Sequence, residues 1–172
     1  MELKQYQQAV LNDLAQYIAI LKEQGSNHKA FSTYWKQNGI TLQQGEETFH
    51  PYCNTMNGAP NMTIKVPTAG GKTFIACNAI RTIFDAMPVN RTKVVAWFVP
   101  SDTILKQTYE NLKNPQHPYR QRIDTLFNGR VEVYDKQALL FGQNFNPTII
   151  KEQLSIFVLS IQSFATKATD KR

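Results

Sequence analysis

Residues 65–73 read Lys65-Val66-Pro67-Thr68-Ala69-Gly70-Gly71-Lys72-Thr73 and lie between an apolar segment and an amphipathic one. Small residues in such a turn let backbone N–H groups converge on phosphate oxygens, while a lysine supplies positive charge and a hydroxyl can bind Mg²⁺. A helix that begins here adds the positive end of its dipole to the same anion site. The stretch therefore predicts a strand–loop–helix unit that binds the phosphates of a nucleotide.

The segments on either side of this loop have the required patterns. Residues 62–66 are apolar and β-branched, which predicts a strand. In residues 73–87, apolar side chains recur at helical spacing, as in an amphipathic helix that packs on a sheet. We therefore expect Ala69, Gly70 and Gly71 to form the phosphate loop, with Lys72 and Thr73 as the catalytic pair and Thr73 as the Mg²⁺ ligand.

The loop departs from the strict pattern G-x-x-x-x-G-K-[ST]. The first glycine of that pattern lies six positions before the lysine, where this chain has Val66. The departure disfavours nucleotide kinases and small GTPases. A chance Gly-Gly-Lys-Thr at a turn remains the alternative that the flanking segments argue against.

The rest of the chain alternates expected helices and strands. Residues 93–99 form a near-continuous apolar run, typical of a strand that is buried on both faces of a parallel sheet. This alternation predicts an α/β fold with a mostly parallel sheet flanked by helices. The remaining strands are expected at 130–134 and 155–160, and the helices at 3–22, 30–37, 102–112, 117–127 and 147–154.

Charge and cysteine content narrow the function. The net charge is +6, and residues 61–172 carry 15 basic against 8 acidic side chains, which suits a polyanionic partner or a solvated surface. Cys53 and Cys77 are expected to be idle thiols, and His50 with Cys53 is at most half of a metal site. No apolar run is long enough to cross a bilayer, so we expect a cytoplasmic protein without membrane contact.

Four ordered motifs resemble those of superfamily 2 helicases and translocases of the DEAD/DEAH-box type. Residues 67–73, from Pro67 and Thr68 onward, resemble motif I. The opening Leu3-Lys4-Gln5-Tyr6-Gln7 is similar to the L-R-x-Y-Q motif, which implies that Gln7 reads adenine. Residues 99–107 resemble motif Ia, and residues 160–164 resemble a further segment that contacts the tracked strand. The resemblance implies a nucleic-acid-binding role for these side chains: Pro100, Ser101, Gln107, Gln162 and Ser163.

The chain looks most like the N-terminal region of the Res subunit of type III restriction enzymes. This resemblance implies a RecA-like P-loop NTPase fold, ATP and Mg²⁺ as cofactors, and an ATP-driven helicase or translocase that cleaves DNA. It also implies backbone contacts to double-stranded DNA and a modification (methyltransferase) subunit as partner. On the residues alone, Ser101 can cap the following helix, donate to a phosphate, or do both.

The resemblance divides the chain into residues 1–26 with the adenine-reading motif, a connector at 27–60, and the first part of an ATP-binding domain at 61–172. The family has glycine where this chain has Ala69, which is tolerable at negative φ and costly at positive φ. No Asp-Glu pair follows residue 160, so we expect an N-terminal piece of a longer motor that ends before the motif II strand and hydrolyses little ATP alone. The alternatives are a complete non-catalytic nucleotide-binding module and a small-substrate P-loop kinase.

Overall fold

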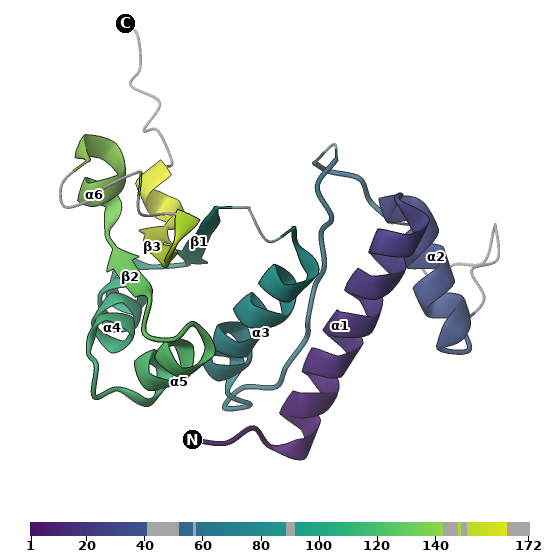
Figure 1. Ribbon diagram of the computed structural model, residues 1–172, viewed down its shortest axis with the longest axis horizontal. Helices are drawn as coiled ribbons and strands as arrows, with labels where there is room; N and C mark the ends of the chain where they lie inside the picture. Colours follow the sequence, from purple (N-terminus) through teal and green to yellow (C-terminus); the bar gives the residue numbers. More distant parts are fainter. Residues whose placement is uncertain (41–51, 57, 89–91, 143–147, 149–150, 165–172) are drawn as a thin grey trace, which may run out of the picture. The chain divides into compact units, whose positions relative to one another are not determined.

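The computed structural model describes residues 1–40, 52–56, 58–88, 92–142, 148 and 151–164. The chain forms two compact units, Glu2–Ala86 and Met87–Arg172, the second of which also includes Met1. We describe each unit by itself (Figure 1).

Three helices build the unit Glu2–Ala86: α1 (Gln5–Gln24), α2 (Asn27–Gln37) and α3 (Lys72–Ala86). Helix α1 packs against both α2 and α3. It ends at Gly25, whose φ of 61° allows its N–H to bond the Leu21 carbonyl. Helix α2 begins directly afterwards, with the Ser26 side chain accepting a hydrogen bond from the Lys29 N–H. The helices expected at 3–22, 30–37 and 73–87 are therefore confirmed.

The core of this unit joins the phosphate-loop region to two helices. Leu11 of α1, Val66 before the loop and Ile75 of α3 form one buried cluster. Because Val66 and Ile75 flank the loop on both sides, this cluster fixes the two ends of the loop against α1.

The strand expected at 62–66 is wrong. These residues have no strand pairing in the described structure and connect Asn61 to the loop as irregular chain. A β-branched sequence becomes a strand only where a neighbouring strand takes up its backbone hydrogen bonds. Here Val66 is instead buried between helices, and Asn61 is held by the Tyr52 hydroxyl and the Cys53 carbonyl.

The unit Met87–Arg172 contains a three-stranded parallel sheet in the order β1-β3-β2. Its strands are β1 (Lys93–Val99), β2 (Val131–Tyr134) and β3 (Leu154–Ser160). Helices α4 (Asp102–Lys113) and α5 (Pro118–Leu126) connect β1 to β2, α6 (Lys136–Phe141) precedes β3, and a 3-10 turn, η2 (Ile161–Phe164), follows it. Helix α4 contacts all three strands and α6 contacts β2 and β3 (Figure 1). The predicted α/β class, with a parallel sheet flanked by helices, is confirmed.

Burial differs between the central and the edge strand. Every residue of β3 is buried, as expected for a strand with neighbours on both sides. In β1 the residues alternate, and Val94, Ala96 and Phe98 are exposed. The expectation that 93–99 is buried on both faces is therefore wrong. The apolar run predicts a strand, but it does not distinguish the centre of the sheet from its edge.

Several smaller predictions have clear outcomes. The helix expected at 117–127 is α5, and it ends before Asn128 (φ 55°) and Gly129 (φ 70°). The strands expected at 130–134 and 155–160 are β2 and β3. The helix expected at 147–154 falls largely outside the described residues, and Leu154 belongs to β3. Helix α6 is absent from the sequence-based prediction, although Asp135 caps it by accepting from the Ala138 N–H.

Candidate nucleotide site

The phosphate loop begins with a tight turn. The Gly70 N–H donates to the Pro67 carbonyl over 3.0 Å, which closes a four-residue turn. Ala69, in the third position of this turn, has a φ of 61°. Type II turns have positive φ at this position and favour glycine there. The condition under which an alanine is costly at position 69 is therefore met.

Two carbonyls of the loop are each held by two donors. The Pro67 carbonyl accepts from the Gly70 N–H and, over 2.9 Å, from the Lys72 ammonium. The Gly70 carbonyl accepts from the Tyr6 hydroxyl over 2.8 Å and from Gln7 Nε2 over 3.3 Å. These contacts turn the oxygens, which would repel a phosphate, toward the protein.

The start of α3 supplies hydrogen-bond donors. The Ile75 N–H bonds the Gly71 carbonyl over 3.0 Å, so the intrahelical ladder begins there. The first N–H groups of an α-helix, which here include those of Lys72 and Thr73, precede the first turn and so have no carbonyl partner within the helix. The Pro67 and Gly70 carbonyls are bonded within the protein, and the first N–H groups of α3 lie at the end of the loop. This is the arrangement of donors found in anion sites.

Both glycines are required by close contacts. A Cβ at Gly70 would lie 2.6 Å from Val66 Cγ1 and 2.9 Å from the Pro67 oxygen. A Cβ at Gly71, where φ is 69°, would lie 2.5 Å from Gln7 Nε2. The loop therefore lies close to α1, and a side chain at Gly70 or Gly71 would require its neighbours to move.

The structure places Gln7 against the loop. Its side chain is 5% exposed, and its Oε1 accepts from the Lys4 N–H over 3.0 Å at the start of α1. Its Nε2 donates to the Gly70 carbonyl. An amide has two donor hydrogens and two acceptor lone pairs, so one of each remains for a ligand. The Gln7 side chain can thus contact a nucleotide base and the loop at once.

The groups that could hold a metal are few. Among the described residues, no cluster of three or more His, Cys, Asp or Glu side chains has the placement of a metal site. Thr73 is the second residue of α3 and is half-buried. Its hydroxyl oxygen is the kind of ligand that binds Mg²⁺ beside phosphate oxygens. The residues of the loop therefore fit a magnesium nucleotide in which the phosphates supply most of the metal ligands.

The expected nucleic-acid contacts gather at one edge of the sheet. The register pairs Val99 of β1 with Ser160 of β3, so both strands end at the same level. Pro100 and Ser101 follow the first strand directly, and Gln162 and Ser163 follow the second within η2. Pro100 and Gln162 are exposed. In parallel sheets, ligand-contacting groups commonly lie at this carboxyl edge.

Ser101 caps helix α4. Its Oγ accepts from the Ile104 N–H over 3.4 Å, which confirms the capping interpretation. As an acceptor it keeps its own O–H as a donor, so capping leaves a phosphate contact open. Gln107 lies in the second turn of α4 with its side chain exposed.

Two side chains make contacts that the sequence-based prediction does not include, Tyr6 at the candidate site and Arg120 within the sheet-containing unit. Tyr6 is one: its place beside Gln7 in the opening motif is a signal that could have suggested it. Arg120 is the other, because the sequence favours a solvated basic residue. It instead pairs with Asp124 over 2.9 Å and donates to the carbonyls of Leu112 and Val131, which ties α5 to α4 and β2.

The two cysteines lie in different environments. Cys77 is fully buried in α3, and this burial raises the pKa of its thiol to about 12. Cys53 is exposed, and both thiols are free. His50, the other half of the possible metal pair, lies outside the described residues.

A phosphate loop that opens a helix, in a chain that also forms a parallel α/β sheet, defines a P-loop nucleotide-binding protein of the RecA-like type. The family model described as "Type III restriction enzyme, res subunit" matches residues 1–172. The chain therefore belongs to the family of type III restriction enzyme res subunits, in its helicase superfamily 2 N-terminal region, and the predicted family and fold class are confirmed. This family has a helicase-like, ATP-binding region. The chain matches no curated protein and no solved structure.

Membrane insertion through a helix finds no support in the described part of the chain, where no helix has the length and apolar character to span a bilayer.

Proposed function

We propose that this chain binds ATP with Mg²⁺ through residues 67–73, and that the protein to which it belongs couples ATP hydrolysis to movement on double-stranded DNA. The observation that carries the proposal is the orientation of the loop. Its Pro67 and Gly70 carbonyls accept hydrogen bonds from protein groups. The loop leads into the N-terminus of α3, and the first N–H groups of a helix point out of that end toward a bound anion.

In this proposal each side chain of the site has a defined role. Lys72 exchanges its bond to the neutral Pro67 carbonyl for phosphate oxygens, and this contact is stronger because the phosphate carries the opposite charge. Thr73 binds Mg²⁺ through its hydroxyl. Gln7 contacts adenine with its remaining donor and acceptor while it holds the Gly70 carbonyl. Bound ATP supplies the hydrolysable phosphate bond, and these residues bind and orient it.

The DNA contacts of the proposal lie at the carboxyl edge of the sheet. Ser101 and the first N–H groups of α4 are suitable donors to a phosphate, and such contacts position a protein on DNA without reading sequence. Pro100, Gln107, Gln162 and Ser163 complete the surface. The excess of 15 basic over 8 acidic side chains in residues 61–172 supports a polyanionic partner.

The wider roles rest on family membership. We propose that the protein restricts foreign DNA together with a modification (methyltransferase) subunit in the cytoplasm. Hydrolysis requires carboxylates that hold Mg²⁺ and position water, and the sequence has no Asp-Glu pair after β3. We therefore expect these 172 residues alone to hydrolyse ATP slowly at most. We likewise propose the division of the chain into an adenine-reading segment (1–26), a connector (27–60) and the first part of the ATP-binding domain (61–172).

Binding of a fluorescent ATP analogue, with and without Mg²⁺, tests the nucleotide site. Lys72→Ala should weaken binding about tenfold to a hundredfold, because a hydrogen bond to a charged group contributes about 1.5–3 kcal/mol. Lys22→Ala is the matched control, since Lys22 is an exposed lysine in the last turn of α1 and lines neither the loop nor the cavity described below. Equal binding by wild type and Lys72→Ala would disprove the assignment of the site.

Binding of a labelled DNA duplex at a series of salt concentrations tests the nucleic-acid role. Displaced counterions should make the affinity fall steeply as salt rises. DNA binding that is insensitive to salt would contradict phosphate contacts, whatever the outcome for ATP.

A further inference from the structure

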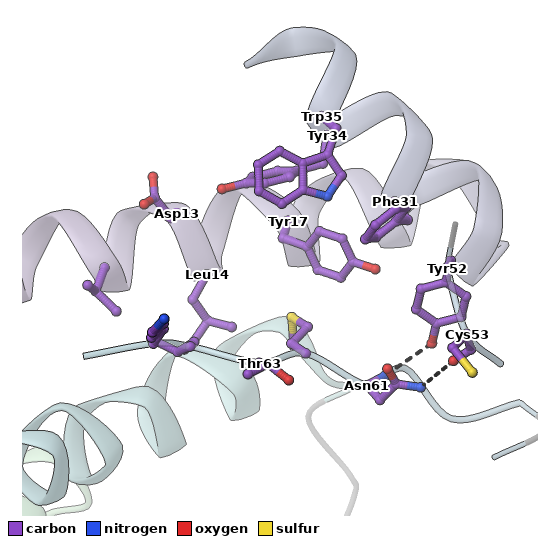
Figure 2. Close-up of a pocket in the computed structure, with 14 residues that line it drawn as sticks. Asp13, Leu14, Tyr17, Phe31, Tyr34, Trp35, Tyr52, Cys53, Asn61 and Thr63 are labelled. Atoms are coloured by element: carbon purple, nitrogen blue, oxygen red, sulfur yellow. Dashed lines mark hydrogen bonds between the residues drawn. The ribbon is translucent and has the colours of Figure 1, made fainter. Parts of the chain in front are cut away.

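A cavity lies in the unit Glu2–Ala86, and none of the phosphate-loop residues lines it. It has a volume of about 500 Å³, within the size range of small-ligand sites. Its walls come from one face of α1, from α2, from Tyr52 and Cys53, and from residues 61–65 (Figure 2). None of residues 67–73 lines it, and neither does Gln7.

Five aromatic side chains dominate the walls of this cavity. They meet mostly edge to face: Tyr17 with Tyr34 at 5.5 Å between ring centroids, and Phe31 with Trp35 at 6.2 Å. Tyr52 lies 5.7 Å from Phe31, and its hydroxyl accepts from the Asn61 N–H, which fixes the ring (Figure 2). Rings in such a perpendicular arrangement hold one another rigidly and offer flat faces to a planar ligand.

One buried polar group in the cavity has no hydrogen-bond partner among the described residues. Tyr17 is 6% exposed, and its buried hydroxyl makes no hydrogen bond with the described residues. Figure 2 shows the hydroxyl directed into the space between α2 and residues 61–65. Burial, followed by the charge of the nearby Tyr52 hydroxyl, raises the Tyr17 pKa, so this phenol keeps its proton and can donate it in a hydrogen bond. An unpaired buried hydroxyl is costly unless a ligand satisfies it.

We propose that this aromatic cavity binds a nucleobase. Every base has a flat π-face that stacks on aromatic side chains, and an edge of donors and acceptors that can satisfy the Tyr17 hydroxyl. An aliphatic ligand would leave that hydroxyl unpaired. A quaternary ammonium ligand could lie against the aromatic faces, but it carries no hydrogen-bond acceptor and would also leave the Tyr17 hydroxyl unpaired.

The base can belong to a free nucleoside or to an unstacked residue of a nucleic-acid strand. Both sources present the same chemistry to the rings. The cavity floor, Met62 to Lys65, leads directly into the phosphate loop. A ligand in the cavity would therefore contact the segment that directly precedes Val66, the residue that anchors the loop in the core.

Trp35 provides a direct reporter of this cavity. In a Trp97→Phe variant it is the single tryptophan of the chain. Thymidine and adenosine, which have no phosphate, should quench its fluorescence in a saturable way at millimolar concentrations. The quenching should persist in Lys72→Ala, which separates this site from the proposed ATP site. Stronger quenching by oligothymidylate than by thymidine would assign the base to a strand, and equal quenching would assign it to a free nucleoside.

Tyr17→Phe removes the hydroxyl and keeps the ring. It should weaken nucleoside binding about twofold to tenfold, in line with the loss of one neutral hydrogen bond, without lowering the melting temperature. Tyr109→Phe on α4 is the matched control and should change nothing. Absence of saturable quenching by nucleosides and oligothymidylate would overturn the proposal. So would quenching that Tyr17→Phe leaves unchanged, because the ligand would then not contact the cavity.

Discussion

Replacing Ala69 by glycine tests the least favourable residue of the phosphate loop. Ala69 has a φ of 61°, a left-handed conformation in which the Cβ of an L-residue crowds the backbone. Glycine has no Cβ and adopts this conformation without penalty. Ala69→Gly should therefore stabilise the protein, although most alanine-to-glycine changes destabilise.

The magnitude follows from two opposing terms. Relief of the left-handed conformation contributes about 1–2 kcal/mol to the free energy of unfolding. The greater freedom of glycine in the unfolded chain subtracts about 0.4–1 kcal/mol. The net gain is about 0–1.6 kcal/mol, with a midpoint of about 0.8 kcal/mol, and in a chain of this length each kcal/mol raises the melting temperature by about 2–4 °C.

Thermal and urea unfolding of wild type, Ala69→Gly and Ala76→Gly measure this effect. Ala76 lies inside α3, seven residues after Ala69, where glycine should cost about 0.5–1 kcal/mol. The same chemical change is thus expected to have opposite signs at the two positions. If Ala69→Gly destabilises as much as Ala76→Gly, Ala69 does not hold a positive φ and the reasoning fails.

Three further predictions concern other parts of the chain. Gly71→Ala should destabilise the protein through its positive φ and its contact with Gln7 Nε2, and part of that loss should disappear in a Gln7→Ala background, as a double-mutant cycle of unfolding free energies would measure. Ser101→Asp should keep the α4 cap and the melting temperature but weaken DNA binding by repelling phosphate; unchanged DNA affinity would leave Ser101 as a cap alone. Cys53 should react with a thiol reagent at about pH 8 while Cys77 stays protected, because burial raises the Cys77 pKa to about 12. Mass spectrometry measures the labelling rate of each thiol, and equal rates would contradict the burial of Cys77. The unfolded thiol ionises near pH 9 and the folded one near 12, so Cys77 should also favour folding less as pH rises through this window.

The sequence predicts the elements of this fold well and their environment less well. Helical spacing and capping residues are local signals, and they place α1, α3 and α5 correctly. The irregular path of 62–66 and the exposure of Val94 and Phe98 depend on which strands pair, which is decided by segments far apart in the chain. An apolar run has the same appearance whether it becomes a central strand such as β3, an edge strand such as β1, or a connecting segment between helices.

The site shows the same division. The small residues of the loop and the following Lys72-Thr73 are visible as a motif, because phosphate binding requires those residue types at that spacing. The place of Tyr6 in the opening motif draws attention to this side chain, but the sequence does not show which group it contacts. Its bond to the Gly70 carbonyl spans 64 positions. The aromatic cavity is equally hidden, because its walls come from segments between residues 10 and 65.

The contacts between α1 and the loop also explain which loop positions can depart from glycine. A Cβ at Gly71 would displace Gln7 Nε2 and would also meet the cost of a φ of 69°, whereas a Cβ at Gly70 would meet Val66 Cγ1 and the Pro67 carbonyl. At position 69 the penalty for a Cβ is conformational, and a left-handed alanine costs an amount that a folded domain can tolerate. The loop therefore admits Ala69 but not a side chain at either following position. It follows that the opening motif of α1 and the glycines of the loop are one structural unit: a change at Gln7 should alter the requirement for glycine at 71 and leave the requirement at 70 intact.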